Sequence, residues 1–200
     1  MNPYTLTLLR HGEIDHDGRL IGRTDLPLNE LGCEQMSRSW QRLNQMAPVT
    51  SMATSPLQRC REFAVHQALH GSLPLKVDER FAEFDFGDWD GMSRAVLSGQ
   101  HPDWGSRVAA GELIPPGGES YEVFRTRVLS GFSEWIQTAR GSHRVLVCHG
   151  GVITALLAEL LGTEFDVAKL MTVQRGGFAQ LSILEGHPAY LMHLESPGEA

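Results

Sequence analysis

The chain has 200 residues, of which 42% are hydrophobic and 20% are charged, values typical of a globular protein with a full-sized core. Its formal net charge of −7 argues against a broad basic surface, and therefore against nucleic acid as a partner. The three cysteines are far apart and form no C-x-x-C pair, so neither a zinc site nor a disulfide framework is expected. We expect no signal peptide and no membrane span, and therefore a cytoplasmic protein.

Short apolar runs alternate along the chain with segments of helical periodicity. In chain order we expect strand Thr5–Leu9, helix Asn29–Met46, strand Ser51–Thr54, a helix from Pro56 to about His70, strand Pro74–Val77, helix Tyr121–Ala139, strand Arg144–Cys148, helix Val152–Leu161, and a hairpin of Phe178–Leu184 and Ala189–Leu194. This order predicts one α/β domain over residues 1–200, a three-layer α/β/α sandwich with a mostly parallel sheet and an antiparallel edge. Residues 81–120, rich in Gly, Pro, Asp and Trp, are expected to form an irregular lid over one face.

The tetrapeptide Arg10-His11-Gly12-Glu13 directly follows the first predicted strand. Ligands of open α/β sheets bind at the carboxyl ends of the strands, where this arginine and histidine are expected to lie. Arginine offers a rigid fork of donors to phosphate oxygens, and neutral imidazole is a nucleophile near pH 7. The motif therefore suggests phosphoryl transfer through a phosphohistidine. A histidine that is only hydrogen-bonded at a strand end is the alternative.

A second histidine follows the most apolar predicted strand, in Cys148-His149-Gly150-Gly151. The backbone N–H groups of Gly150 and Gly151 begin a helix there and are expected to point at whatever His149 contacts. The helix dipole favours an anion at that place. The alternative is a tight strand-to-helix turn that needs glycine for its backbone angles and in which His149 has no functional role.

Arg59 lies one turn into the helix that follows the second strand. A single helix arginine is usually solvated, but here three strand ends direct Arg10, His11, Arg59 and His149 toward one rim. Because converging cations repel one another unless an anion lies between them, the set favours a phosphate pocket.

Phosphoryl transfer also needs an acid that protonates the leaving alkoxide. Glu83 has an apolar neighbour on each side and is the candidate, whereas Asp85, Asp88 and Asp90 are interpreted as turn residues. This stretch misses the calcium-loop pattern because Phe86 stands where an acid is needed. The sequence contains no C-x5-R loop, G-x-S-x-G elbow or P-loop, so histidine is the expected nucleophile, and no metal or other cofactor is expected.

Six segments carry recognisable motifs in a fixed order: Leu9–Glu13, Gly22–Leu28, Ser55–Cys60, Glu83 with Gly87–Gly91, Pro115–Ser120 and His149–Ile153. Each is weak alone, but together they span almost the whole chain. In this combination the chain resembles the histidine phosphatase superfamily, in its phosphoglycerate mutase-like branch.

The resemblance implies that His11 is the nucleophile, which is phosphorylated and then hydrolysed. It implies that Glu83 acts first as the acid and then as the base. It also implies that Arg10, Arg59 and His149 bind the phosphoryl oxygens. His11 must be neutral to attack, whereas a positive charge on His149 would help to bind phosphate.

Other matched or unmatched positions bear on the same pocket. The motifs place Gly22 and Gly150 among the substrate-binding residues. Two positions depart from the family pattern: Ile21 stands where Ser or Thr is common, and Asp17 lies near the place of a common asparagine. The sequence therefore does not decide whether these two positions make the minor phosphate contacts that are usual in the family.

The substrate is expected to be a small phosphorylated molecule, and the residues do not decide the oligomeric state. The chain is too short for the insertion that is usual in phosphoglycerate mutases, which favours hydrolysis. The motifs most resemble the α-ribazole phosphatases, which implies α-ribazole 5′-phosphate, a substrate of cobalamin biosynthesis. Trp89 and Trp104 would then either stack on its benzimidazole-type base or simply hold the lid down.

Other functions fit the same residues. A broad-specificity small-molecule phosphatase is one alternative, and a phosphoglycerate mutase-like or fructose-2,6-bisphosphatase-like enzyme is another. A non-catalytic regulatory module that binds phospho-ligands is an alternative of a different class. Glu83 separates these classes, because a binding module needs the cations but not the acid.

Overall fold

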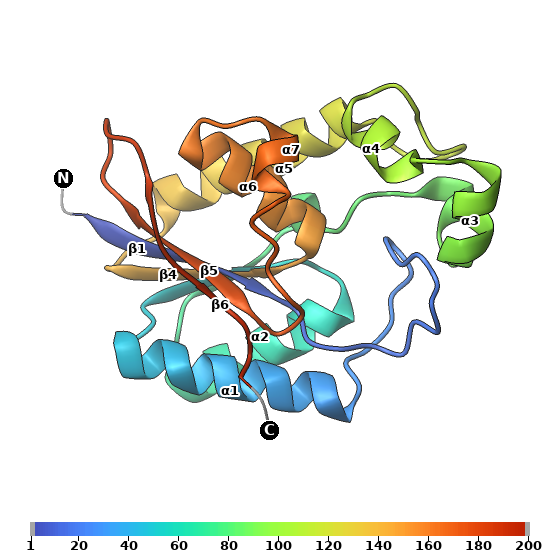
Figure 1. Ribbon diagram of the computed structural model, residues 1–200. Helices are drawn as coiled ribbons and strands as arrows, with labels where there is room; N and C mark the ends of the chain where they lie inside the picture. The colour runs from blue at the N-terminus through green and yellow to red at the C-terminus, as the bar shows by residue number, and fades with distance from the viewer. Residues whose placement is uncertain (1–2, 199–200) are drawn as a thin grey trace.

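Leu6, Leu8 and Leu9 are fully buried, which is expected of a strand with helices on both of its faces. In the computed structural model, which describes residues 3–198, they lie in the central strand β1 (Tyr4–Arg10) of a six-stranded sheet (Figure 1). The other strands are β2 (Ser51–Thr54), β3 (Leu75–Val77), β4 (His143–Cys148), β5 (Phe178–Ile183) and β6 (Tyr190–Glu195).

The sheet has the strand order β3-β2-β4-β1-β5-β6. The pairs β3–β2, β2–β4 and β4–β1 are parallel, whereas β1–β5 and β5–β6 are antiparallel. The predicted mostly parallel sheet with an antiparallel edge is confirmed. Because β1, β2 and β4 are parallel neighbours, their carboxyl ends meet at one edge, which brings the segments after Arg10, Thr54 and Cys148 together.

Helices cover both faces of the sheet, as Figure 1 shows. On one face, α1 (Glu30–Met46) and α2 (Gln58–Gly71) pack on the core that contains Leu9. On the other face, α5 (Tyr121–Thr138) and α6 (Gly150–Leu161) pack on the core that contains Leu6 and Leu8. The α/β/α sandwich is therefore confirmed.

Local hydrogen bonds explain where two of these helices begin. Asn29 caps α1, as predicted, because its side chain accepts the N–H of Gly32. The helix predicted from Pro56 begins only at Gln58, because Leu57 is still extended. The Asp25 carboxylate accepts the N–H of Gln58 at 2.7 Å, so a distant loop takes the place of a local cap.

Three helices were absent from the sequence prediction: α3 (Arg94–Gln100), α4 (Trp104–Ala109) and α7 (Phe165–Ala168). They are only four to seven residues long, which gives little helical periodicity. Two 3-10 turns, Glu79–Phe81 and Gly87–Trp89, also form. The 81–120 segment was expected to lie over one face of the sheet. Figure 1 shows its helices α3 and α4 beyond the carboxyl end of β1.

Aromatic side chains pack the 81–120 segment against itself. The rings of Trp89 and Trp104 meet edge to face with centroids 6.2 Å apart, and Trp104 meets Phe86 in the same way at 5.9 Å. Trp89 is only 5% exposed. These contacts favour the view that the tryptophans hold the segment down, and they give no support to stacking on a ligand base.

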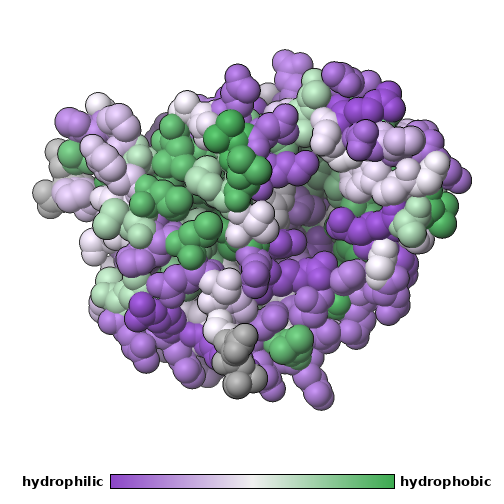
Figure 2. Space-filling model, in the orientation of Figure 1, coloured by the Kyte–Doolittle hydropathy of each residue, from purple (hydrophilic) through white to green (hydrophobic). Residues whose placement is uncertain are grey.

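The edge strand β6 is apolar as well as unpaired on its outer side among residues 3–198. Tyr190, Met192 and Leu194 are all exposed. Figure 2 shows hydrophobic side chains gathered over this part of the molecule, around β6 and α7. None of the helices in the described part of the chain has the length and hydropathy that a membrane span requires.

A polar network is buried inside the sheet around His143. The His143 Nδ1–H donates to the carbonyl oxygen of Ala47 at 2.9 Å, so Nε2 accepts from the Thr7 hydroxyl, also at 2.9 Å. Gln180 in turn donates to Thr7 at 3.2 Å. Burial lowers the pKa of His143 below its usual range, and the network satisfies the neutral ring.

We expect the free energy of unfolding to fall as the pH decreases below about 6.5, the ordinary pKa of histidine. A lowered pKa in the folded state means that the unfolded chain binds the proton first, so stability is complete above pH 6.5 and is lost below it. One such histidine contributes a slope of at most about 1.4 kcal/mol per pH unit. Urea unfolding at pH 7.5 and 5.5 measures the loss, which His143→Gln should reduce.

The exposed His187 provides the matched control, because His187→Gln removes an imidazole that is not buried. A wild-type stability that is equal at the two pH values would contradict the role assigned to the buried network. So would an equal acid-side loss in His143→Gln and His187→Gln.

Candidate active site

His11 follows β1 directly and is only 5% exposed. Its Nδ1 lies 2.8 Å from the carbonyl oxygen of Gly12. A carbonyl oxygen can only accept, so Nδ1 carries the proton and Nε2 keeps its lone pair. Burial lowers the pKa of His11 well below its usual range, and the charges of Arg59 and Arg10 lower that pKa further. His11 is therefore a neutral imidazole with a free Nε2 atom, the form that can attack phosphorus.

His149 lies beside His11 at the end of β4. The two ring centroids are 5.2 Å apart, and the rings meet edge to face. The Nε2 of His149 is 2.7 Å from the hydroxyl of Ser55, which follows β2. The parallel order of β1, β4 and β2 thus brings three loop ends into contact, as the sequence predicts.

A positive charge on His149, which would help to bind phosphate, is disfavoured in this pocket. Burial lowers the pKa of His149 well below its usual range, and Arg59, His11 and Arg10 lower it further. The repulsion among converging cations was part of the sequence analysis, and burial adds a desolvation cost to it. A bound phosphoryl dianion would oppose this effect by offsetting the charge of the arginines.

Two arginines supply buried positive charge. Arg59, from the first turn of α2, is 1% exposed and donates to the carbonyl oxygens of Gly22 at 2.7 Å and Thr24 at 2.8 Å. Arg10 donates to the carbonyl oxygen of Val173 at 2.8 Å. The Nε atoms of both arginines are buried and have no hydrogen-bond partner within residues 3–198. Each guanidinium is therefore held by loop carbonyls and keeps donor capacity for an anion.

Asp90 organises the loop that holds Arg59. Its carboxylate accepts the N–H groups of Gly22 at 3.0 Å, Arg23 at 2.7 Å and Thr24 at 2.8 Å. Asp90 lies in a turn, as predicted, and its side chain also orders a loop 66 to 68 residues away in sequence. A Cβ atom on Gly22 would lie 2.2 Å from the carbonyl oxygen of Phe84, so this position needs glycine. Gly22 thus shapes the pocket and holds Arg59 through its carbonyl.

Glu83 lies at the N-terminus of α6. Its Oε2 accepts the N–H of Gly151 at 3.1 Å, and its Oε1 accepts the N–H of Phe84 at 3.0 Å. The Gly151 N–H, expected to point at a ligand, is therefore committed to Glu83. A Cβ atom on Gly150 would lie 3.2 Å from the Arg10 Cζ, so Gly150 lets that guanidinium approach the helix end. The carboxylate gains from the helix dipole at this place.

An ion pair that the sequence analysis missed holds the segment carrying Glu83. Arg127, on α5, makes two parallel bonds to Glu119, at 2.9 and 2.6 Å. Arg127 also donates to the carbonyl oxygens of Ala82 at 2.8 Å and Glu83 at 3.0 Å. Both charged side chains are mostly buried. Glu119 lies in the Pro115–Ser120 motif, so the sequence offered it as a candidate site residue. Nothing in the sequence near Arg127 indicates that Glu119 is its partner.

The two departures from the family pattern add no polar contact to the pocket. The Asp17 side chain is 81% exposed and pairs with Arg19, and its backbone is left-handed at φ 49°. The side chain of Ile21 has no polar atom. The structure thus brings together the predicted residues Arg10, His11, Arg59, Glu83, His149, Gly22 and Gly150 at the carboxyl edge of the sheet.

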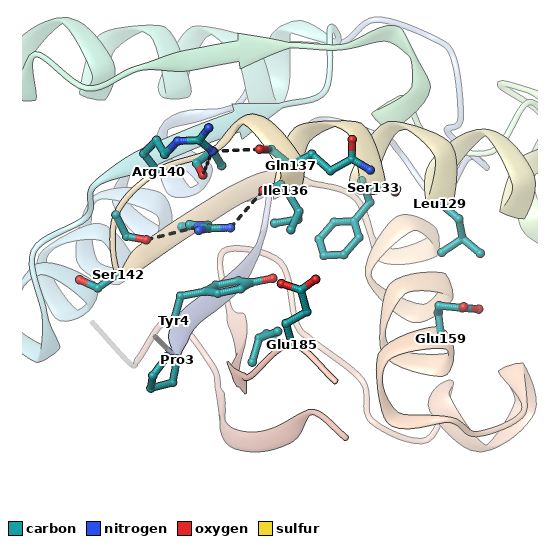
Figure 3. A pocket seen from close by; sticks show the side chains of 15 residues that line it. Pro3, Tyr4, Leu129, Ser133, Ile136, Gln137, Arg140, Ser142, Glu159 and Glu185 are labelled. Carbon is teal, nitrogen blue, oxygen red and sulfur yellow. Dashed lines mark hydrogen bonds between the residues drawn. The ribbon is translucent and has the colours of Figure 1, made fainter. Parts of the chain in front are cut away.

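A separate groove of about 880 Å³ lies away from these residues, near the amino ends of β1 and β4 (Figure 3). Its lining includes Tyr4, Ile136 and Arg144. The Arg144 guanidinium lies 3.9 Å from the centre of the Tyr4 ring and donates to the carbonyl oxygens of Ile136 and Gly141. The charge of Arg144 is therefore already satisfied by the protein.

Two named proteins are similar in sequence to most of this chain. It is 32% identical to the glucosyl-3-phosphoglycerate phosphatase of Mycobacterium tuberculosis (strain ATCC 25618 / H37Rv), with 94% of this chain and 87% of the relative covered. It is 34% identical to the "Bifunctional protein Rv2228c" of the same organism, with 92% of this chain covered. The chain spans only half the length of that bifunctional relative.

A solved structure shows the same fold. The α-ribazole phosphatase of Shigella flexneri superposes with a TM-score of 0.83 at 25% identity, and 98% of each chain is covered. The model of the histidine phosphatase superfamily (branch 1) matches residues 6–194. The match includes both strand-end histidines, Arg10, Arg59 and Glu83. The resemblance seen in the sequence is confirmed, and the chain belongs to the histidine phosphatase superfamily, branch 1.

Proposed function

We propose that this protein is a phosphomonoesterase that works through a phosphohistidine on His11. The observation that carries the proposal is the state of His11: neutral, buried, with its Nδ1 proton fixed by Gly12 and its Nε2 free. Arg10 and Arg59 beside it keep buried donors without partners in the described chain. A nucleophile next to unsatisfied cationic donors is suited to a phosphoryl group.

The reaction follows from these positions in two steps. In the first, Nε2 of His11 attacks phosphorus, the ester P–O bond breaks, and Glu83 gives a proton to the leaving oxygen. In the second, water attacks the phosphorus and gives a proton to Glu83, while the N–P bond breaks and its electron pair returns to Nε2 of His11. Arg10 and Arg59 stabilise the charge on the phosphoryl oxygens in both steps. The protein's own cations supply this charge, so the proposal includes no metal or other cofactor.

The substrate proposals come from two directions. The motif resemblance proposes α-ribazole 5′-phosphate, and a structural neighbour is an α-ribazole phosphatase. Curated relatives with high coverage are glucosyl-3-phosphoglycerate phosphatases. The two molecules differ beside the phosphate, because a phosphoglycerate carries a carboxylate and α-ribazole 5′-phosphate carries an uncharged base. A small phosphorylated molecule is common to both proposals.

Glu83→Gln distinguishes an enzyme from a module that only binds phospho-ligands. We expect kcat on a phosphomonoester of an alkyl alcohol, whose leaving alkoxide needs a proton, to fall by roughly 10²–10⁴-fold, because the amide cannot give or take the proton. Phosphate affinity, measured by calorimetry, should change little. A rate within a factor of about three of the wild type would show that Glu83 is not the acid.

His11→Ala tests the nucleophile itself. The wild type should form an acid-labile phosphoenzyme that rapid acid quench after mixing with a ³²P-labelled monoester detects. The variant should lose both this species and turnover, because no other neutral imidazole has a free Nε2 at this place in the described chain. Persistent labelling in His11→Ala would assign the phosphoryl group to another residue.

Gly151→Ala tests the position of Glu83 without changing its chemistry. A Cβ atom at Gly151 would lie 2.5 Å from Glu83 Oε1, so the carboxylate must move. We expect kcat to fall by at least about tenfold, since a small displacement of an acid is costly. Gly105→Ala, in α4, has no heavy atom within 4 Å of the new Cβ and is the matched control. Equal kcat values in the two variants would contradict the placement of Glu83.

A further inference from the structure

Ser55 lies between β2 and α2, and its backbone is bound to the strand that leads to His149. The residue is completely buried. Its N–H donates to the carbonyl oxygen of Val147 at 3.1 Å, in the neighbouring strand β4, which His149 follows. The Ser55 hydroxyl is therefore held against the His149 ring, with 2.7 Å between Oγ and Nε2.

The other groups around this hydroxyl determine the direction of its bond to the ring. Oγ accepts the N–H of Leu57 at 3.3 Å, which leaves the hydroxyl hydrogen to be placed. A buried donor is rarely left without an acceptor. Nε2 of His149 lies within hydrogen-bond distance, whereas the sulfur of Cys60, which also lies nearby, is a weak acceptor. Nε2 therefore accepts the hydroxyl hydrogen and carries no proton of its own.

The proton of the neutral ring is then on the other nitrogen. Burial and the charge of Arg59 lower the pKa of His149, so its imidazole is neutral and has a single N–H, at Nδ1. Among residues 3–198, no nitrogen or oxygen atom accepts from this Nδ1. Its contact is the Cys60 sulfur, 3.9 Å away, whose own hydrogen is directed at the carbonyl oxygen of Cys148. His149 thus keeps a buried N–H without a strong acceptor.

We propose that Ser55 is a positioning residue: it fixes His149 as the Nδ1–H tautomer, so that a neutral ring donates a hydrogen bond to a phosphoryl oxygen. The inference rests on the proposed function, in which the phosphoryl group is bound to His11. The two histidine rings meet edge to face with centroids 5.2 Å apart, so the His149 ring borders the place of that group. A ring that the pocket keeps neutral can bind phosphate only through an N–H, and it therefore needs a fixed tautomer rather than a second proton.

The tautomer of His149 can be measured directly. In protein that contains ¹⁵N-labelled histidine, two-bond ¹H–¹⁵N correlation spectra distinguish a protonated ring nitrogen from an unprotonated one, and His149→Gln assigns the signals. In the wild type at pH 7.5 we expect a protonated Nδ1 and an unprotonated Nε2 on His149. A protonated Nε2 would overturn the inference, and this measurement needs no variant of Ser55.

Ser55→Ala removes the hydroxyl and leaves both ring nitrogens of His149 free to carry the proton. We expect a mixture of the two tautomers, and a Kd for inorganic phosphate, measured by calorimetry, that is at least about fivefold higher than in the wild type. Ser51, on the same strand, is 2% exposed, and its hydroxyl has no partner in the described chain. Ser51→Ala is therefore the matched control and should change neither quantity.

Two results with these variants would also overturn the inference. One is a Ser55→Ala protein in which His149 keeps a fixed Nδ1–H, because a merely structural role of Ser55 would raise Kd without moving the proton. The other is an equal rise of Kd in Ser51→Ala and Ser55→Ala. Neither the spectra nor the calorimetry requires turnover. Absence of turnover and of phosphoenzyme in a wild type with the expected tautomer would overturn the proposed function and not the role of Ser55.

Discussion

Buried positive charge without a carboxylate partner is the constraint on which this site depends. Arg59 is almost completely buried, and neither Arg59 nor Arg10 forms a salt bridge within residues 3–198. Desolvating a guanidinium costs several kcal/mol unless it is paired. Backbone carbonyl oxygens offset part of that cost and leave the charge itself uncompensated. A pocket of this kind is most stable when an anion fills it.

The same charge determines the state of the two histidines. Because both rings are buried beside Arg59 and Arg10, their pKa values lie well below the usual range. His11 is thereby kept neutral, and its tautomer is set by one backbone carbonyl. The lowered pKa keeps His149 neutral in this pocket, so a positive charge on it is not a preformed feature. The arginines that we propose as phosphate ligands thus also keep the proposed nucleophile neutral.

Distant segments hold these groups in place. Asp90 orders the Gly22–Thr24 turn, whose carbonyls hold Arg59. The Glu119–Arg127 pair fixes the chain on either side of Glu83. Both devices involve the 81–120 segment. This segment therefore contains the proposed acid and the carboxylate that orders the loop around Arg59, while its tryptophans are used for packing.

Sequence alone determined the alternation of strands and helices, because buried strands and amphipathic helices have periodicities that a short window reveals. It also predicted that four residues lie together, because the carboxyl ends of parallel strands meet at one edge of the sheet whatever the path of the loops. These residues are Arg10, His11, Arg59 and His149. Tertiary structure decided what those side chains contact. The partner of Glu83 is the Gly151 N–H, the partner of Arg127 is Glu119, and no local pattern encodes either. The short helices α3, α4 and α7 each bury one side chain in the core, and burial lowers the pKa of His149; both are effects of segments far apart in the chain on one another.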